Sequence, residues 1–287
     1  MITINPKEIS VAVLHSHLLS AVIPRPIALA STIDANGNVN LSPFSFFNCF
    51  GSNPPLLIFS PNRRVRDDST KHTYENVLAV PEVVIHIVNY KLVQQTSLAS
   101  TEYERGVNEF IKAGFTSVPS TLVSPPRVGE APIAIECKVR EVISTGEKGG
   151  SSNLILCEVL LLHINEDVLG DDGKVDPVKL DAVARLGGDY YARIIPEAIF
   201  KVPKPLDKIG IGLDNLPEEI RLSPVLTGND LAQLANVSAI PPVSKLPSFD
   251  ITSTREQHIA AQKLISENKI SEAWQILLQP LGTNRGT

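Results

Sequence analysis

Short apolar runs separated by turn residues recur along the first two-thirds of the chain. Residues 26–33 (PIALASTI) are apolar and β-branched enough for a strand, and Asn36-Gly37 after them is a strong hairpin signal. The return strand is expected at Val39–Ser42. Further strands are predicted at residues 44–50, 56–60, 83–88, 133–144 and 154–164. Six or more strands joined by short helices favour a closed β-barrel.

Helical patterns are fewer in this part of the chain. A short helix is predicted at residues 73–80, and one or two helical segments are predicted within residues 92–113. Asp176-Pro177 is a helix start, because an acidic N-cap precedes proline at the first helical position. That helix is expected to run to about Arg185 and to end at Gly187-Gly188.

The composition changes near residue 202, where prolines begin to space out the chain. Two amphipathic helices are predicted within Thr254–Leu278, separated near Asn268-Lys269. We therefore predict a mainly β domain at residues 1–205 and a Pro-rich segment with a C-terminal helical extension at residues 206–287. The extension could pack on the barrel, extend a dimer interface or cap a pocket. Trp274 is expected to be a packing anchor, with partner binding as the alternative.

Charge and cysteine content narrow the class of protein. The 26 Lys and Arg residues against 31 Asp and Glu residues give a net charge of −5, which disfavours nucleic-acid binding. Apolar runs stay well short of the roughly 20 residues of a membrane span, and the N-terminus lacks the pattern of a secretory signal. The three cysteines are widely spaced, which disfavours a disulfide framework or a zinc site and favours reduced thiols on strands. A cytoplasmic protein without membrane contact is predicted.

Several common active-site motifs are missing from the sequence. It has no P-loop and no Gly-x-Ser-x-Gly elbow, and Gly210-Ile211-Gly212 lacks the third glycine of a dinucleotide-binding turn. His15 and His17 could share one strand face, but no third ligand is near, so no metal site is predicted. Residues 147–152 are interpreted as a mobile hairpin tip that could cover a ligand.

Three polar segments together indicate a composite binding site. Residues 24–32 end a strand with two hydroxyls, residues 40–48 place small polar groups among aromatic ones, and residues 60–76 bring cations to the start of a short helix. The last arrangement suits an anion. Taken singly, the same hydroxyls and aromatic rings could be ordinary strand and core residues. His86 and His163 lie in apolar strands and are expected to be interior or interface histidines.

The order of these segments resembles the flavin-reductase-like, FMN-binding split-barrel family, in its flavoredoxin group. The resemblance rests on PRPIALAST, on D-x-x-G-x-x-N-L-S-P-F-S-F-F-N, on N-P-P and S-P, on K-x-T-x-x-N, and on a Leu-Gly-Gly-x-Tyr element within residues 175–194. It covers roughly residues 10–205. It implies a six-stranded Greek-key split β-barrel, a homodimer, and FMN near the dimer interface. His72 stands where the family commonly has aspartate, which leaves the role of that position open.

The physical demands of FMN agree with this resemblance. Its ring needs an apolar slot with polar groups at the edge, and its phosphate needs cations and amides. The glycine turn at 187–188 would allow close approach of the backbone, and a tyrosine could wall the ring. The predicted cofactor-binding residues are Ser31, Thr32, Ser45, Phe46, Phe47, Asn48, Arg63, Lys71, Thr73, Gly188 and Tyr190.

Two functions compete at this stage. The first is an NAD(P)H-dependent flavin reductase, in which NADH or NADPH passes hydride to FMN (or FAD) and no side-chain acid or base is required. The second is a non-enzymatic, flavoredoxin-like electron carrier served by a redox protein partner, for which the acidic run 166–176 is a weak indication.

Overall fold

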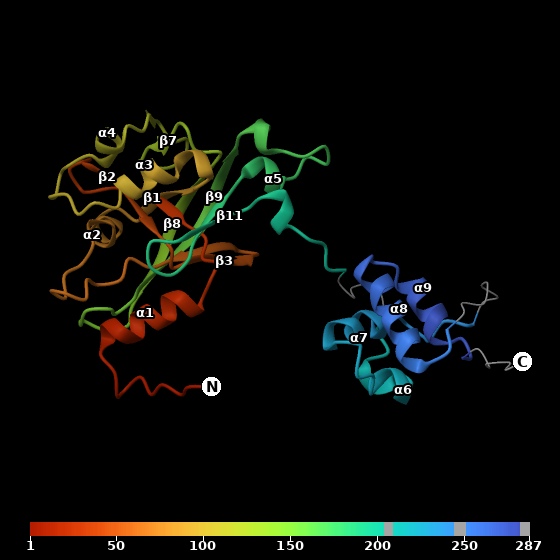
Figure 1. The fold of residues 1–287 in the computed structure, drawn as a ribbon. Helices are drawn as coiled ribbons and strands as arrows, with labels where there is room; N and C mark the ends of the chain where they lie inside the picture. Colours follow the sequence, from red (N-terminus) through yellow and green to blue (C-terminus); the bar gives the residue numbers. More distant parts are fainter. Residues whose placement is uncertain (204–208, 244–250, 282–287) are drawn as a thin grey trace, which may run out of the picture. The chain divides into compact units, whose positions relative to one another are not determined.

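The computed structural model describes residues 1–203, 209–243 and 251–281 (Figure 1). The chain divides into two compact units, Met1–Phe200 and Lys201–Thr287. Each unit has a hydrophobic core of its own, formed by residues between 27 and 183 in the first and between 216 and 277 in the second. The predicted boundary near residue 205 lies outside the described residues.

The first unit is dominated by a seven-stranded sheet in the order β2-β1-β5-β8-β9-β4-β3 (Figure 1). Every neighbouring pair is antiparallel. The strands are β1 (Ala28–Ile33), β2 (Val39–Phe44), β3 (Phe47–Ser52), β4 (Pro55–Phe59), β5 (Glu82–Ile87), β8 (Ile133–Ser144) and β9 (Asn153–Ile164).

The sheet curls without closing. Its edge strands β2 and β3 follow one another in the chain, and only Ser45 and Phe46 separate them. Three peptide steps from Phe44 to Phe47 reach at most about 10 Å, so the two edges must approach each other. The two strands do not pair with each other in the sheet. The sheet is not closed, so the closed barrel expected from the strand pattern is wrong, although its seven strands agree with the expected six or more. The six-stranded Greek-key arrangement implied by the family resemblance is not confirmed.

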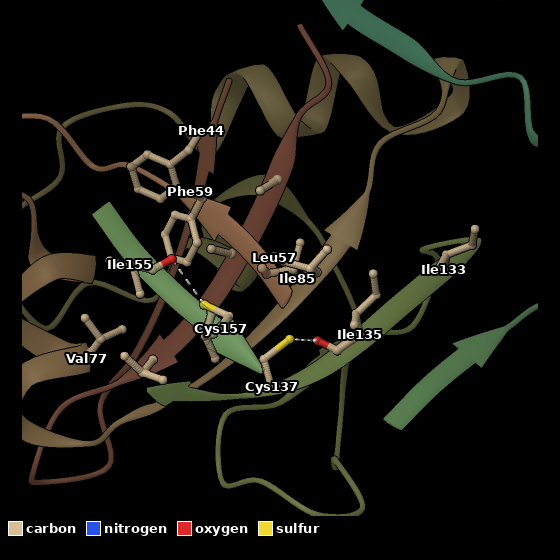
Figure 2. Packing of buried hydrophobic residues seen from close by; sticks show 14 of the residues in the cluster. Phe44, Leu57, Phe59, Val77, Ile85, Ile133, Ile135, Cys137, Ile155 and Cys157 are labelled. Carbon is tan, nitrogen blue, oxygen red and sulfur yellow. Dashed lines mark hydrogen bonds between the residues drawn. The ribbon is translucent and has the colours of Figure 1, made fainter. Parts of the chain in front are cut away.

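The strand predictions are otherwise confirmed to within a few residues. Ile33 pairs with Val39 across the predicted hairpin, and Gly37 at its tip has φ +83°, which glycine adopts without strain. The hairpin of β8 and β9 spans twelve residues on each side. The strands of the sheet and the short helix α2 (His72–Ala79) share one hydrophobic core. Figure 2 shows Phe44, Phe59, Ile155 and Cys157 in this core.

Helices and short hairpins cover the rest of the first unit. His86 is fully buried and binds β5 to its neighbours: its Nδ1 lies 2.8 Å from the Leu29 carbonyl, and its Nε2 accepts from the Val128 amide at 2.9 Å. His163 instead meets the buried Glu136 carboxylate at 2.7 Å.

The remaining elements of the first unit are α1 (Val11–Ala21), α3 (Val93–Leu98), α4 (Glu109–Ala113), α5 (Pro177–Leu180), β6 (Ser117–Val118), β7 (Arg127–Val128), β10 (Val183–Arg185), β11 (Tyr191–Arg193), and the 3-10 turns η1 (Tyr90–Leu92), η2 (Glu166–Val168) and η3 (Pro196–Ala198).

Two segments differ from the sequence-based expectation. His15 and His17 lie on helix α1, not on a strand. The helix that begins at Asp176 has the predicted cap, since its carboxylate accepts from the amides of residues 178 and 179, but it ends at Leu180. Asp181 takes a left-handed conformation (φ +52°) and binds Arg193 through both oxygens, at 2.7 and 2.9 Å. The chain then forms the hairpin of β10 and β11.

The second unit is a small helical bundle. Trp274, the one tryptophan of the sequence, is fully buried, and its indole donates to the Leu234 carbonyl at 3.1 Å. The two predicted helices are confirmed as α8 (Thr254–Ser266) and α9 (Ile270–Leu277). The other elements are η4 (Leu213–Asn215), α6 (Glu218–Arg221) and α7 (Gly228–Ala235).

Two kinds of feature are absent from the residues that the structure describes. No helix within residues 1–203, 209–243 and 251–281 has the length and apolar character needed to cross a membrane. In the same ranges, no group of three or more His, Cys, Asp and Glu side chains is arranged to hold a metal ion.

Candidate functional site

A cavity of about 420 Å³ lies beside the link between the sheet edges. Its walls come from the end of β2, the link itself, the loop between β4 and α2, and the segment between α3 and α4. The lining residues are His15, Ser42, Pro43, Phe44, Ser45, Phe46, Ser60, Asn62, Arg63, Arg64, Val65, Arg66, Lys71, Ser100, Glu102 and Gly150.

One wall of this cavity is strongly cationic. Arg63, Arg64, Arg66 and Lys71 all line it, and all come from the loop between β4 and α2. Among the described lining residues, Glu102 is the one carboxylate set against them. Four cations against one carboxylate leave an excess of positive charge, which favours an anionic ligand.

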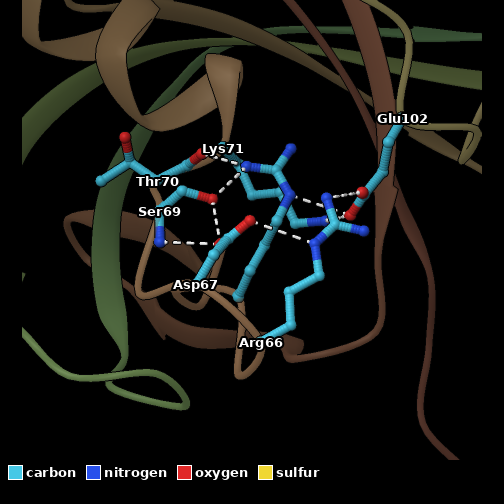
Figure 3. A network of polar contacts seen from close by, with 7 residues as sticks. Arg66, Asp67, Ser69, Thr70, Lys71 and Glu102 are labelled. Carbon is cyan, nitrogen blue, oxygen red and sulfur yellow. Dashed lines mark hydrogen bonds and ion pairs between the residues drawn. The ribbon is translucent and has the colours of Figure 1, made fainter.

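Glu102 lies at the centre of an ion-pair network, shown in Figure 3. Its Oε1 lies 2.8 Å from Arg64 Nε and 3.4 Å from Lys71 Nζ, and its Oε2 lies 2.5 Å from Arg66 Nη2. The hydrogen bond from Arg64, with the neighbouring cations, lowers the pKa of Glu102 to about 2. Glu102 is therefore an anion throughout the physiological pH range.

The loop that carries the cations is held by its own hydrogen bonds. Arg64 Nη1 donates to the Ser69 hydroxyl at 2.9 Å, and Arg63 Nη1 donates to the Asp68 carbonyl at 2.9 Å. The hairpin tip between β8 and β9 packs on this loop, since the Gly150 amide donates to the Arg63 carbonyl at 3.1 Å. A Cβ on Gly149 would come within 2.7 Å of the Val65 Cα atom, so glycine permits this approach. The tip therefore braces the cationic wall.

Two of the cations keep capacity for a further partner or charge. The Arg63 Nε is buried and has no hydrogen-bond partner. Burial, and then the nearby Arg64 charge, lower the pKa of Lys71, which means that its charge is only partly compensated by Glu102. An anion entering the cavity would add to the compensation of the Lys71 charge.

A series of buried hydrogen bonds anchors the start of helix α2. The Thr73 hydroxyl donates to Asn40 Oδ1 at 2.7 Å, and Asn40 Nδ2 donates to Glu109 Oε1 at 2.9 Å. The other Glu109 oxygen accepts from the Leu41 amide at 2.9 Å, and burial raises the pKa of this carboxyl. These hydrogen bonds anchor the first turn of α2 and so help to fix the position of Lys71, its N-cap residue.

The opposite side of the cavity is more apolar. The Phe46 ring is 38% exposed and meets the His15 ring edge-on, with centroids 6.2 Å apart. Ser45 accepts from Arg25 Nε at 3.4 Å. Arg25 is buried, and its guanidinium also donates to the carbonyls of Val22 and Leu186, each at 2.8 Å, and to that of Leu19. Arg25 thus ties the end of α1 to the link that bears the aromatic ring.

The predicted site residues divide into three groups. Ser45, Phe46, Arg63 and Lys71 line the main cavity, and Thr73 lines a small pocket of about 30 Å³ that shares Lys71 and Glu102 with it.

A second group does not line the cavity. Ser31 and Thr32 are fully buried, and the Thr32 hydroxyl accepts from Asn76 at 3.1 Å, so neither side chain reaches the cavity. Phe47 packs against the core, and Asn48 is exposed on β3.

The third group lies on another part of the first unit. Gly188 (φ +57°) is in the turn between β10 and β11, and the Tyr190 side chain is 74% exposed there. Within one chain, the structure does not bring them to the cavity.

Sequence reasoning missed several lining residues. Arg66 carried a usable signal, because it extends the cationic run that begins at Arg63. Glu102 carried none, since it lies more than thirty positions further along the chain in an irregular segment. His15 was placed on a strand and so was not connected with Phe46.

The sequence of the first unit is similar to that of a known protein family. Residues 19–179 match the family model described as "Flavin reductase like domain". The chain is 36% identical, over 197 residues, to an "Uncharacterized protein" of Aquifex aeolicus, which covers 68% of this chain and 97% of that protein.

Two solved structures show the same architecture. Nitrilotriacetate monooxygenase component B from Bacillus cereus is 28% identical with a TM-score of 0.66, covering 70% of this chain and 98% of that one. The 2-nitrobenzoate 2-nitroreductase NbaA of Pseudomonas fluorescens is 25% identical with a TM-score of 0.61, covering 73% of this chain and 100% of that one.

Proposed function

Because the chain belongs to the flavin reductase-like family, we propose that it is an oxidoreductase that binds FMN and reduces it with NADH or NADPH. Bound flavin supplies the hydride-accepting and electron-donating chemistry, and the protein supplies binding, orientation and electrostatics. The likeness to a monooxygenase component supports release of reduced flavin to a second enzyme as the next step.

The observation that carries this proposal is the cationic wall beside an aromatic ring. A phosphate monoester is close to a dianion at neutral pH and needs several cationic donors. Arg63, Arg64 and Lys71 line the cavity and supply them. A volume of about 420 Å³ falls within the roughly 300–1,000 Å³ of small-molecule sites. The residues present therefore fit a phosphorylated flavin.

The remaining parts of the cavity suit the flat ring. Phe46 offers an aromatic surface, and Ser45 offers a hydroxyl already fixed by Arg25. Ser31, Thr32 and Thr73 would act indirectly, because their buried hydrogen bonds and packing set the strands and the start of α2. Phe47 and Asn48 are the first two residues of β3, directly after the link.

A homodimer would explain the residues that lie apart from the cavity. Strand β9 exposes Leu160, Leu162 and Ile164 at alternate positions, and β3 exposes Phe50, which is 64% accessible. Exposed apolar side chains of this kind are typical of interfaces. In such a dimer, the hairpin carrying Gly188 and Tyr190 would approach the flavin of the other copy.

The proposal is tested by visible spectroscopy on the purified protein with FMN. Binding is titrated under argon, and NADH or NADPH is then added; loss of the oxidised-flavin absorbance is the expected result. Lys71→Gln should weaken FMN binding by about tenfold, as expected for one charge-assisted contact, while riboflavin binding should stay the same. Lys138→Gln, on an exposed position of β8, is the matched control.

Two outcomes would change the conclusion. If FMN does not bind, the flavin assignment fails and only the fold remains. If FMN binds but neither nicotinamide reduces it, hydride transfer is ruled out, and a carrier that takes electrons from a protein donor replaces the reductase.

A further inference from the structure

One of the residues that line the cavity, Glu102, is itself an anion. The Glu102 carboxylate engages Arg64, Arg66 and Lys71 with both of its oxygens (Figure 3). Two of these cations, Arg64 and Lys71, are among those that the proposed function assigns to the phosphate, and Arg66 lines the same wall. The carboxylate and the ligand phosphate therefore need the same donors, and both cannot have all of them.

The contacts of Glu102 are of a kind that can be exchanged. Its side chain is 37% exposed, and it forms ion pairs with the side chains of Arg64, Arg66 and Lys71. The backbone of its segment is held separately: the Thr101 amide donates to Leu98 at 3.1 Å, and the Tyr103 amide donates to Thr101 at 2.9 Å. The carboxylate can leave the cations without unravelling the segment between α3 and α4.

The charges decide which anion prevails. A carboxylate brings one negative charge, whereas a phosphate monoester brings nearly two and three acceptor oxygens. A dianion can replace Glu102 at the cations, but a neutral or weakly charged ligand gains too little there to do so. The strongly lowered pKa of Glu102 keeps it charged at neutral pH, so this competition operates under ordinary conditions.

We propose that Glu102 is a specificity-determining residue, an internal competitor that a ligand's phosphate must displace from Arg64, Arg66 and Lys71. This inference rests on the proposed function, because FMN is the ligand whose phosphate is concerned. It assigns to Glu102 an effect opposite to that of a binding residue: the carboxylate lowers the affinity for the phosphorylated flavin.

The test compares FMN and riboflavin binding to the full-length protein and to Glu102→Gln, by fluorescence titration. The substitution keeps the size of the side chain and removes its charge. FMN affinity should rise by roughly two- to fivefold, the scale of partly exposed charge pairs, and riboflavin affinity should stay constant. Glu104→Gln, an exposed position in the same segment, should leave both affinities unchanged.

The outcomes separate this inference from the proposed function. If the wild-type protein binds FMN and Glu102→Gln binds it equally or more weakly, Glu102 orients the cations and the competition is refuted, while the flavin assignment stands. If both flavins gain equally, the effect is a general change of the cavity, which also refutes it. If neither protein binds FMN, the flavin assignment and the competition fail together.

Discussion

The buried histidine of β5 should make the first unit sensitive to mild acid. Burial lowers the pKa of His86 to about 4 in the folded chain, against an ordinary value of 6.5. The hydrogen bond from Nδ1–H to the Leu29 carbonyl works against this shift, but burial outweighs it, and Nε2 accepts from the Val128 amide. Protonation of Nε2 would set an N–H against that amide, so the fold holds the imidazole neutral.

The size of the effect follows from linkage. Between pH 6.5 and 4 the unfolded chain binds a proton at this position and the folded chain does not, so stability falls as the pH falls. At about 1.36 kcal/mol per pH unit, the loss is about 2 kcal/mol at pH 5 and about 3 kcal/mol at pH 4. This is a large part of a typical domain stability of about 5–15 kcal/mol.

The assay is urea unfolding across this pH range, followed by far-ultraviolet circular dichroism for the wild-type protein and His86→Gln. The variant is expected to be less stable at pH 7 but to lose less stability on acidification, with a difference of about 2 kcal/mol at pH 5. His17→Gln, an exposed histidine on α1, controls for the loss of an imidazole. Trp274 fluorescence follows the second unit and should show no effect of either substitution. Equal pH slopes in the wild type and His86→Gln would refute the reasoning.

Two further predictions concern the supports of the cavity and the division of the chain. Arg25→Met should destabilise the first unit by about 3 kcal/mol, because it leaves the carbonyls of Val22 and Leu186 without their charged donor; faster amide exchange at the end of α1 checks this, and unchanged exchange would contradict it. A chain ending at Phe200 should keep the urea midpoint of the first unit and its FMN affinity, because the two cores share no residue. A lower midpoint in the shortened chain would show that the second unit supports the first.

The strands could be predicted because their side chains repeat a pattern that packing enforces. Ile85 and Ile155 lie in the core, and the residues around them alternate or form apolar runs. Helix α1 gave no such signal, because none of its side chains is buried. The end of α5 was also missed, since it depends on the left-handed Asp181 and its pairing with Arg193, a partner twelve residues away.

The site could be predicted only where its residues are local in sequence. Ser45, Phe46 and Lys71 fall in the motifs that carry the family resemblance, and Arg63 lies two residues after the Ser60-Pro61 pair. Whether a hydroxyl such as Ser31 faces a cavity or the interior depends on which face of a curled sheet is covered, and sequence alternation does not distinguish the two. Charge partners from irregular segments, such as Glu102, follow from the tertiary fold alone.

The two-residue link at Ser45 and Phe46 also bears on aggregation. Unpaired edge strands expose backbone donors and acceptors that can recruit strands from other molecules. Here both edges of the sheet, β2 and β3, are drawn toward each other by the link. Each edge hinders the approach of a foreign strand to the other, with no closing hydrogen bonds needed. The cavity proposed for the flavin is lined by the same link, so we expect a longer link both to alter the cavity and to leave the two edges more open to strand pairing.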